Sequence, residues 1–189
     1  MKAIPAMSLG VLLAVTAQSA VSQTPLPPLP NGFQVDPAVA QVQAPMRAAG
    51  VGDGTTGNKA NQSMSPCFSD PKVSFGYGCM LNPMAKTMVD GLLKTPQDPA
   101  RQGAADLDEP AGKQAWKGGV LEWRKQTWPV FGGHPCKDSQ VIFYQGKWTG
   151  YAGDKLIVIS IYNLYNSKDQ GQVWIDEYIG KITAALGSQ

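Results

Sequence analysis

The pattern of hydrophobic and polar positions is clearest in the last third of the chain. The run SQVIFYQ (residues 139–145) is short and rich in β-branched and aromatic residues, and it predicts a strand. Gly146 predicts a turn into a second short strand, KWTGY (147–151), and AGD (152–154) predicts another turn. KLIVISIYN (155–163) is apolar almost without alternation, which is typical of a central strand covered on both faces.

Helical spacing predicts two helices that pack on these strands. Four aliphatic residues near the end recur at i, i+4, i+7 and i+11 and predict an amphipathic closing helix: Ile175, Ile179, Ile182 and Leu186. An earlier helix is predicted to start at Asn82, a good capping residue, with Pro83 in its first turn. Its expected buried face holds Met84, Met88 and Leu92.

A third helix is predicted within residues 109–128. Trp116, Val120 and Trp123 recur there at helical intervals, whereas Gly118-Gly119 is unfavourable inside a helix. Strands and helices together predict an α+β fold, a small antiparallel meander of about three strands packed with two or three helices. We assign this globular domain to residues 67–189, because all five tryptophans and all six tyrosines lie there.

Residues 23–66 differ in composition from everything that follows. They are rich in Pro, Ala, Gly and Gln and hold one aromatic residue, Phe33. Such a segment buries too little apolar surface to offset its ordering entropy, so we expect a disordered Pro/Gly/Ala-rich arm. Within it, PLPPLP (residues 25–30) predicts a semi-rigid polyproline II spacer.

Residues 1–22 have the pattern of a secretory signal peptide. Lys2 precedes an apolar run from about Ala3 to Ala17, which is too short to span a bilayer, and small residues follow it. Cleavage after Ser19 or after Ser22 fits the pattern. We therefore expect export to the periplasm or out of the cell, with an uncleaved anchor helix as the alternative. No later stretch predicts a membrane span.

Charge narrows the range of partners. The formal net charge is only +2, and acidic and basic residues are interspersed. With this balance we see no cluster of basic residues that would bind a nucleic acid or an anionic membrane surface, so we expect neither as a partner. A protein or a cell-envelope polymer fits better.

Export changes the interpretation of the cysteines. Cys67, Cys79 and Cys136 would enter an oxidising compartment, where disulfides persist. Because three is an odd number, we expect one disulfide and one free thiol, and the sequence leaves all three pairings open. A zinc site made by the three cysteines and His134, the only histidine, is a weaker alternative because no CxxC spacing supports it. No metal or cofactor is predicted.

A catalytic alternative rests on Cys79 and His134. Cys79 precedes the predicted helix at Asn82, and His134 precedes the run VIFY (141–144). This order resembles papain-like cell-wall hydrolases of the NlpC/P60 type, and the resemblance implies a peptidoglycan amidase or peptidase with a Cys–His nucleophile. Because the helix must start at Asn82, Cys79 lies three residues before its N-terminus.

Aromatic residues around the predicted hairpin suggest a binding surface instead. Tyr144, Trp148 and Tyr151 flank Gly146, and Trp148 stands between polar neighbours. Exposed aromatic side chains there would suit recognition of a sugar or a protein. The leading hypothesis is therefore an exported, non-enzymatic binding protein with a disulfide-stapled domain, an accessory of envelope machinery or an inhibitor.

Overall fold

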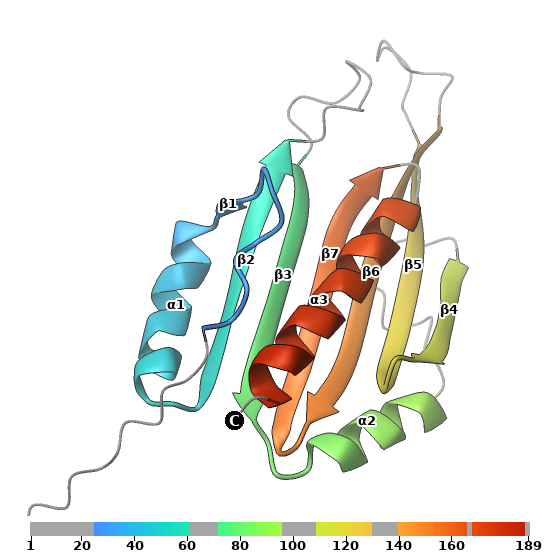
Figure 1. Cartoon of the computed structure of the whole chain (residues 1–189). Coiled ribbons are helices and arrows are strands. Elements are labelled where there is room, and N and C mark those ends of the chain that lie inside the picture. The colour runs from blue at the N-terminus through green and yellow to red at the C-terminus, as the bar shows by residue number, and fades with distance from the viewer. Residues whose placement is uncertain (1–24, 61–71, 96–108, 130–139, 166–167, 188–189) are drawn as a thin grey trace, which may run out of the picture.

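The structure is a computed structural model, and it describes residues 25–60, 72–95, 109–129, 140–165 and 168–187. Within these ranges seven strands form one antiparallel sheet in the order β1-β2-β3-β7-β6-β5-β4 (Figure 1). The strands are Gln34–Val35 (β1), Gly52–Ala60 (β2), Lys72–Leu81 (β3), Glu109–Trp116 (β4), Gly119–Pro129 (β5), Gln140–Ala152 (β6) and Lys155–Tyr165 (β7). The helices are Pro37–Ala48 (α1), Ala85–Lys94 (α2) and Asp169–Gly187 (α3).

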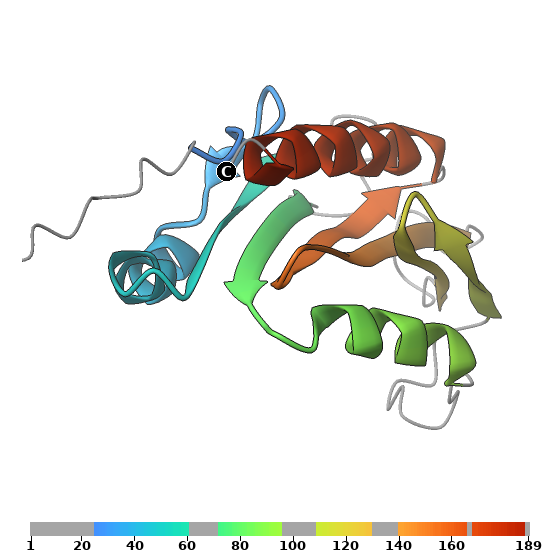
Figure 2. The ribbon, with the colours of Figure 1, turned by 60° about the horizontal axis from the view of Figure 1, so that its bottom comes forward.

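Helices lie on both faces of the sheet (Figures 1 and 2). α3 crosses one face over β6 and β7. α2 packs on the opposite face, mainly against β6 and β5, and α1 packs against β2 on the same side as α2. Among the helices described, none combines the length and the apolar character that a membrane crossing needs.

The main core lies between α3 and the centre of the sheet. Alternate residues of β3 and β7 point toward α3, and they share one buried cluster with its inner face: Phe75, Tyr77, Ile157, Ile159, Ile161, Ile175, Tyr178, Ile179 and Ile182. Burial of one such side chain stabilises the fold by about 1.5–3 kcal/mol. The closing helix is therefore confirmed, and so is the central position of residues 155–163, because β7 lies between β3 and β6.

The predicted meander of about three strands is wrong, and Gly146 is the first reason. The chain does not turn there but continues through Gly146 within β6, with a register shift between Tyr144 and Gly146. A Cβ at Gly146 would lie 2.6 Å from the ring of Trp123. The missing side chain therefore makes room for an indole ring and does not mark a turn.

The helix predicted within residues 109–128 is also wrong, because these residues form the β4–β5 hairpin. Lys117 and Gly118 have φ of 43° and 75°, the positive values that a two-residue type I′ turn requires. Trp116 and Trp123 still reach α3, because they lie on the face of the sheet that α3 covers. Their indole N–H groups donate to Asp176 and Gln172 at 2.7 and 3.1 Å, respectively.

The expected disordered arm is wrong for residues 25–60, which contain β1, α1 and β2. All nine residues of β2 pair with β3, although β2 (GDGTTGNKA) has almost no apolar side chain. Phe33 packs edge-on against Trp174 and Phe75, with ring centroids 5.3 and 6.0 Å apart. Composition did not predict the ordered structure of this region, because backbone hydrogen bonds between strands and the packing of Phe33 stabilise it.

The second predicted helix forms, but it buries a different face. α2 begins at Ala85, and Asn82 precedes it, with its Oδ1 accepting the backbone N–H of Met84 at 2.9 Å. Ala85 and Val89 are buried, whereas Met84 and Met88 are 62% and 47% exposed. The predicted face is therefore wrong for Met84 and Met88, whereas Leu92 does pack, partly buried, against the cluster that contains Ala85 and Val89.

Candidate functional site

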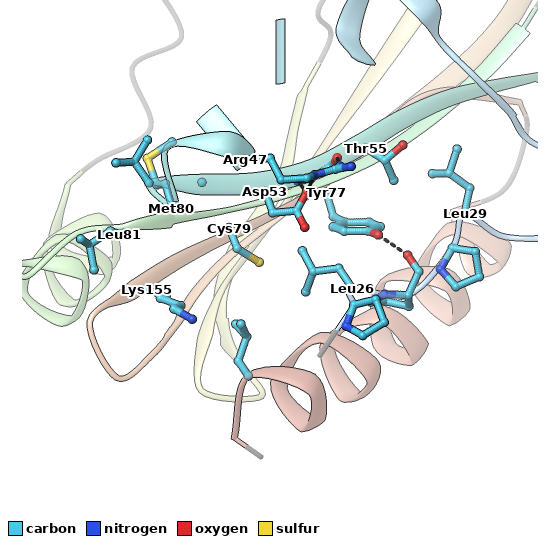
Figure 3. Close-up of a pocket in the computed structure, with 18 of the residues that line it drawn as sticks. Leu26, Leu29, Arg47, Asp53, Thr55, Tyr77, Cys79, Met80, Leu81 and Lys155 are labelled. Carbon is cyan, nitrogen blue, oxygen red and sulfur yellow. Dashed lines mark hydrogen bonds and ion pairs between the residues drawn. The ribbon is translucent and has the colours of Figure 1, made fainter. Parts of the chain in front are cut away.

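The candidate site is a pocket on the α3 face, at the end of the sheet where β2 begins and β3 ends. It has a volume of about 510 Å³. Its walls come from the Pro-rich segment (residues 25–30), from β2 and β3, and from the last turn of α3 (Figure 3). We call it the β2–β3 pocket. Sites for small ligands commonly have volumes of about 300–1,000 Å³.

The wall of the β2–β3 pocket is more apolar than polar. Leu26 and Leu29 come from the Pro-rich segment, Tyr77 and Cys79 from β3, and Leu186 from α3. Figure 3 shows the Cys79 side chain directed into the space between β3 and Leu26. Strand alternation explains this arrangement, since Tyr77 and Cys79 are two residues apart and share the face toward α3.

Charged groups line the pocket on both sides of Cys79, with Arg47 and Asp53 toward β2 and Lys155 toward β7. The Arg47 Nε–Asp53 Oδ1 ion pair is 2.6 Å long, and Arg47 also donates to the Gly54 carbonyl at 3.2 Å. Asp53 lies opposite Cys79 in the β2–β3 register, and Lys155 lies at the start of β7. The pocket therefore combines an apolar body with cationic and anionic groups at its edge.

Cys79 is a free, buried thiol whose ionisation is opposed. Burial, and secondarily the negative charge of Asp53, raises its pKa to about 12, while Lys155 acts in the opposite direction. A nucleophilic cysteine needs the thiolate form near neutral pH. Cys79 also lies inside a strand and not at a helix N-terminus, so its surroundings do not favour nucleophilic catalysis.

Two tyrosine hydroxyls bind the Pro-rich segment. The Tyr77 hydroxyl donates to the carbonyl of Pro27, and the Tyr178 hydroxyl donates to the carbonyl of Pro28. Burial raises the pKa of both phenols, that of Tyr178 to about 12. Both hydroxyls therefore remain protonated donors at neutral pH.

Of the aromatic residues predicted to bind, Trp148 is fully buried, whereas Tyr144 and Tyr151 are partly exposed. Trp148 is 1% exposed, and its indole N–H donates to the Trp116 carbonyl at 2.8 Å. Tyr144 is partly buried against the main core, and Tyr151 is partly buried against a smaller cluster under α2. Trp148 therefore has no exposed ring with which to contact a partner.

Several predicted site residues lie outside the described part of the chain. These are His134, Cys67 and Cys136, so the structure does not bring them to Cys79 or separate them from it. Among the residues that it does describe, no three His, Cys, Asp or Glu side chains gather as a metal site. No protein-family model and no curated protein matches the chain.

The sequence prediction missed the role of the Pro-rich segment. A polyproline II helix has three residues per turn, so Leu26 and Leu29 lie on one side of it. Both pack against the main core in the structure. Two leucines three residues apart were therefore an available signal that PLPPLP packs against something. The opposing tyrosines left no such signal, because only the fold places them together.

Proposed function

We propose that this chain is an exported, non-enzymatic binding protein and that the β2–β3 pocket holds an acyl chain carried by a component of the cell envelope. The observation that carries the proposal is the pocket itself, a space of about 510 Å³ whose wall is more apolar than polar and carries charged groups on both sides of Cys79. An amphipathic ligand needs such a site, because its chain leaves water while its polar head stays at the edge. The predicted signal peptide would bring the protein to the cell envelope, where this ligand is expected.

The edge of the pocket suits a negatively charged head group. Lys155 brings a positive charge to the β7 side of the pocket, and Arg47 lines the β2 side, where its charge is shared with Asp53. A carboxylate or phosphate head would therefore be placed near Lys155, with the chain directed toward Leu26 and Leu186. This arrangement narrows the expected partner from a protein or an envelope polymer to an acylated component.

The alternative of a cysteine peptidoglycan hydrolase receives no support from the described residues. Cys79 is buried and protonated, and its charged neighbours are Asp53 and Lys155. A base that accepts the thiol proton is needed for this chemistry. We therefore favour binding over catalysis.

The disulfide staple stays a prediction, because Cys67 and Cys136 lie outside the described residues. Cys79, the one cysteine that the structure describes, is a buried free thiol.

A fluorescent long-chain fatty acid tests the pocket directly. We expect saturable binding to the wild-type chain and at least tenfold weaker binding to Val51→Asp and to Leu81→Asp. Both residues line the pocket and are 45% and 50% exposed, so the variants should fold. Leu93→Asp, similarly exposed but on α2, is the matched control and should bind as wild type. Absence of saturable binding, or equal loss in the control, would contradict the proposal.

A further inference from the structure

The Pro-rich segment is held in the manner of a bound peptide. It lies across the α3 face and takes no part in the described pairing of strands. Two of its leucine side chains pack against the core, and two of its carbonyls accept hydrogen bonds from tyrosine hydroxyls. A bound peptide ligand makes contacts of the same kind. None of its six residues is buried.

The receiving surface matches the chemistry of a proline-rich segment. Tyr77 and Tyr178 lie side by side, with ring centroids 5.7 Å apart, and their hydroxyls bind two successive carbonyls, those of Pro27 and Pro28. Proline has no N–H group, so a surface that offers only donors leaves none of its backbone groups unsatisfied. Aromatic surfaces bind polyproline II segments well because the segment is already extended and loses little entropy.

The surface also receives two leucines that are three residues apart. Leu26 and Leu29 lie on the side of the segment that faces the core. A Cβ at Gly57 would lie 2.5 Å from Leu29 Cδ1, so this glycine of β2 makes room for the leucine. A segment without leucines at this spacing would lose both apolar contacts.

We infer that Tyr77, Tyr178 and the positions that receive Leu26 and Leu29 form a docking groove for a proline-rich segment of a partner protein, and that the chain's own PLPPLP masks it. The sequence seated in the groove identifies the class of partner, a polyproline II segment with leucines three residues apart. The inference does not depend on the ligand of the β2–β3 pocket.

Masking follows from the covalent attachment of the segment. A short tether holds a segment near its groove at an effective concentration on the order of millimolar. A partner peptide competes only when the segment detaches, and partly exposed, unpaired segments are among the first parts of a fold to open. The intact chain should therefore bind a partner weakly, and releasing the segment should strengthen binding.

In the experiment, the intact chain is folded first, and the Pro-rich segment is then released by proteolytic cleavage. A specific protease site is inserted between Asn31 and Gly32, two exposed residues in the turn that follows the segment. After cleavage, a fluorescein-labelled peptide of residues 23–31 (QTPLPPLPN) is titrated and followed by anisotropy. We expect saturable binding to the cleaved protein, at least tenfold tighter than to the uncleaved protein.

Two controls identify the contacts. A peptide with Leu26→Ser and Leu29→Ser should bind at least tenfold more weakly, and Tyr178→Phe in the cleaved protein should weaken binding about fivefold through one lost hydrogen bond. Tyr162→Phe, an exposed tyrosine, should change nothing.

Two outcomes overturn the inference. In one, the cleaved protein stays folded and binds neither peptide, or binds both equally. In the other, cleavage unfolds the protein, which would make the segment a structural part of the fold only. Tyr77, Leu26 and Leu29 also line the β2–β3 pocket. A failure of fatty-acid binding would still leave this result standing, because the titration measures binding of the peptide and not of a fatty acid.

Discussion

The centre of the sheet and its β1–β2 edge are stabilised in different ways. Where α3 packs on β6 and β7, five residues of the helix are buried, and they meet the isoleucines of β7. Where α1 packs on β2, no residue of the helix is buried, and β2 is mostly Gly, Thr and polar residues. Apolar packing holds the first region. Backbone pairing, the Arg47–Asp53 ion pair and an Asp36 cap hold the second.

This difference in packing is related to where the candidate binding surfaces lie. The β2–β3 pocket and the Pro-rich segment lie where the weakly packed edge meets the main core, next to the end of α3. Binding surfaces that exchange occupants need parts of the fold that open at low cost. A dense core and a lightly packed edge therefore perform separate tasks in one sheet.

The largest difference between the regions should appear in Trp148→Ala and Val42→Ala. Trp148 is fully buried, so its loss should cost about 3–5 kcal/mol in the free energy of unfolding. Val42 on α1 is 68% exposed, and its loss should cost no more than about 0.5 kcal/mol. Urea denaturation followed by far-UV circular dichroism measures both. Similar costs for the two variants would remove the contrast.

A smaller effect distinguishes two glycines of α3. A Cβ at Gly171 would lie 2.7 Å from Leu164 Cδ2 and 2.9 Å from the Trp123 ring, so Gly171→Ala should destabilise by about 1–3 kcal/mol. A Cβ at Gly180 meets nothing within 4 Å, so Gly180→Ala should stabilise by about 0.5–1 kcal/mol through helix propensity. Thermal unfolding of both variants checks the opposite signs. Equal shifts would mean that α3 packs less tightly at its start than we describe.

The smallest effect concerns Cys79, at the border between the two regions. Its pKa is raised in the folded state, so the protonated thiol contributes full stability below about pH 9, and this stability is lost as pH rises toward 12. Between pH 7 and pH 10, wild type should lose about 1 kcal/mol more than Cys79→Ala. Urea midpoints at both pH values measure this difference. Identical losses, or fast alkylation of Cys79 at neutral pH, would show an accessible thiol.

Local sequence patterns predicted the elements that apolar side chains specify. The closing helix follows from the spacing of Ile175, Ile179 and Ile182, and β7 follows from its continuous apolar run. The same approach missed β2, because its strand pairs through the backbone. It also misread Gly146, because a glycine that makes room for a distant ring looks like a glycine that turns the chain.

The candidate site was less predictable than the fold. Cys79 was recognised as chemically notable, but its burial and its neighbour Asp53 depend on the β2–β3 register. Trp148 was expected at the surface because its sequence neighbours are polar. In a strand, however, alternate residues face opposite sides, so Lys147 and Thr149 say nothing about the side on which Trp148 lies.

The sequence by itself determined where helix α3 and strand β7 form, because hydrophobic periodicity is a local property. Only the tertiary structure decided that PLPPLP packs on the sheet, that Trp116, Trp123 and Trp148 lie over it, and that a pocket forms beside Cys79. These features depend on contacts between residues far apart in the chain. The hydroxyl of Tyr178 reaches the carbonyl of Pro28 only after seven strands have placed α3 over the sheet.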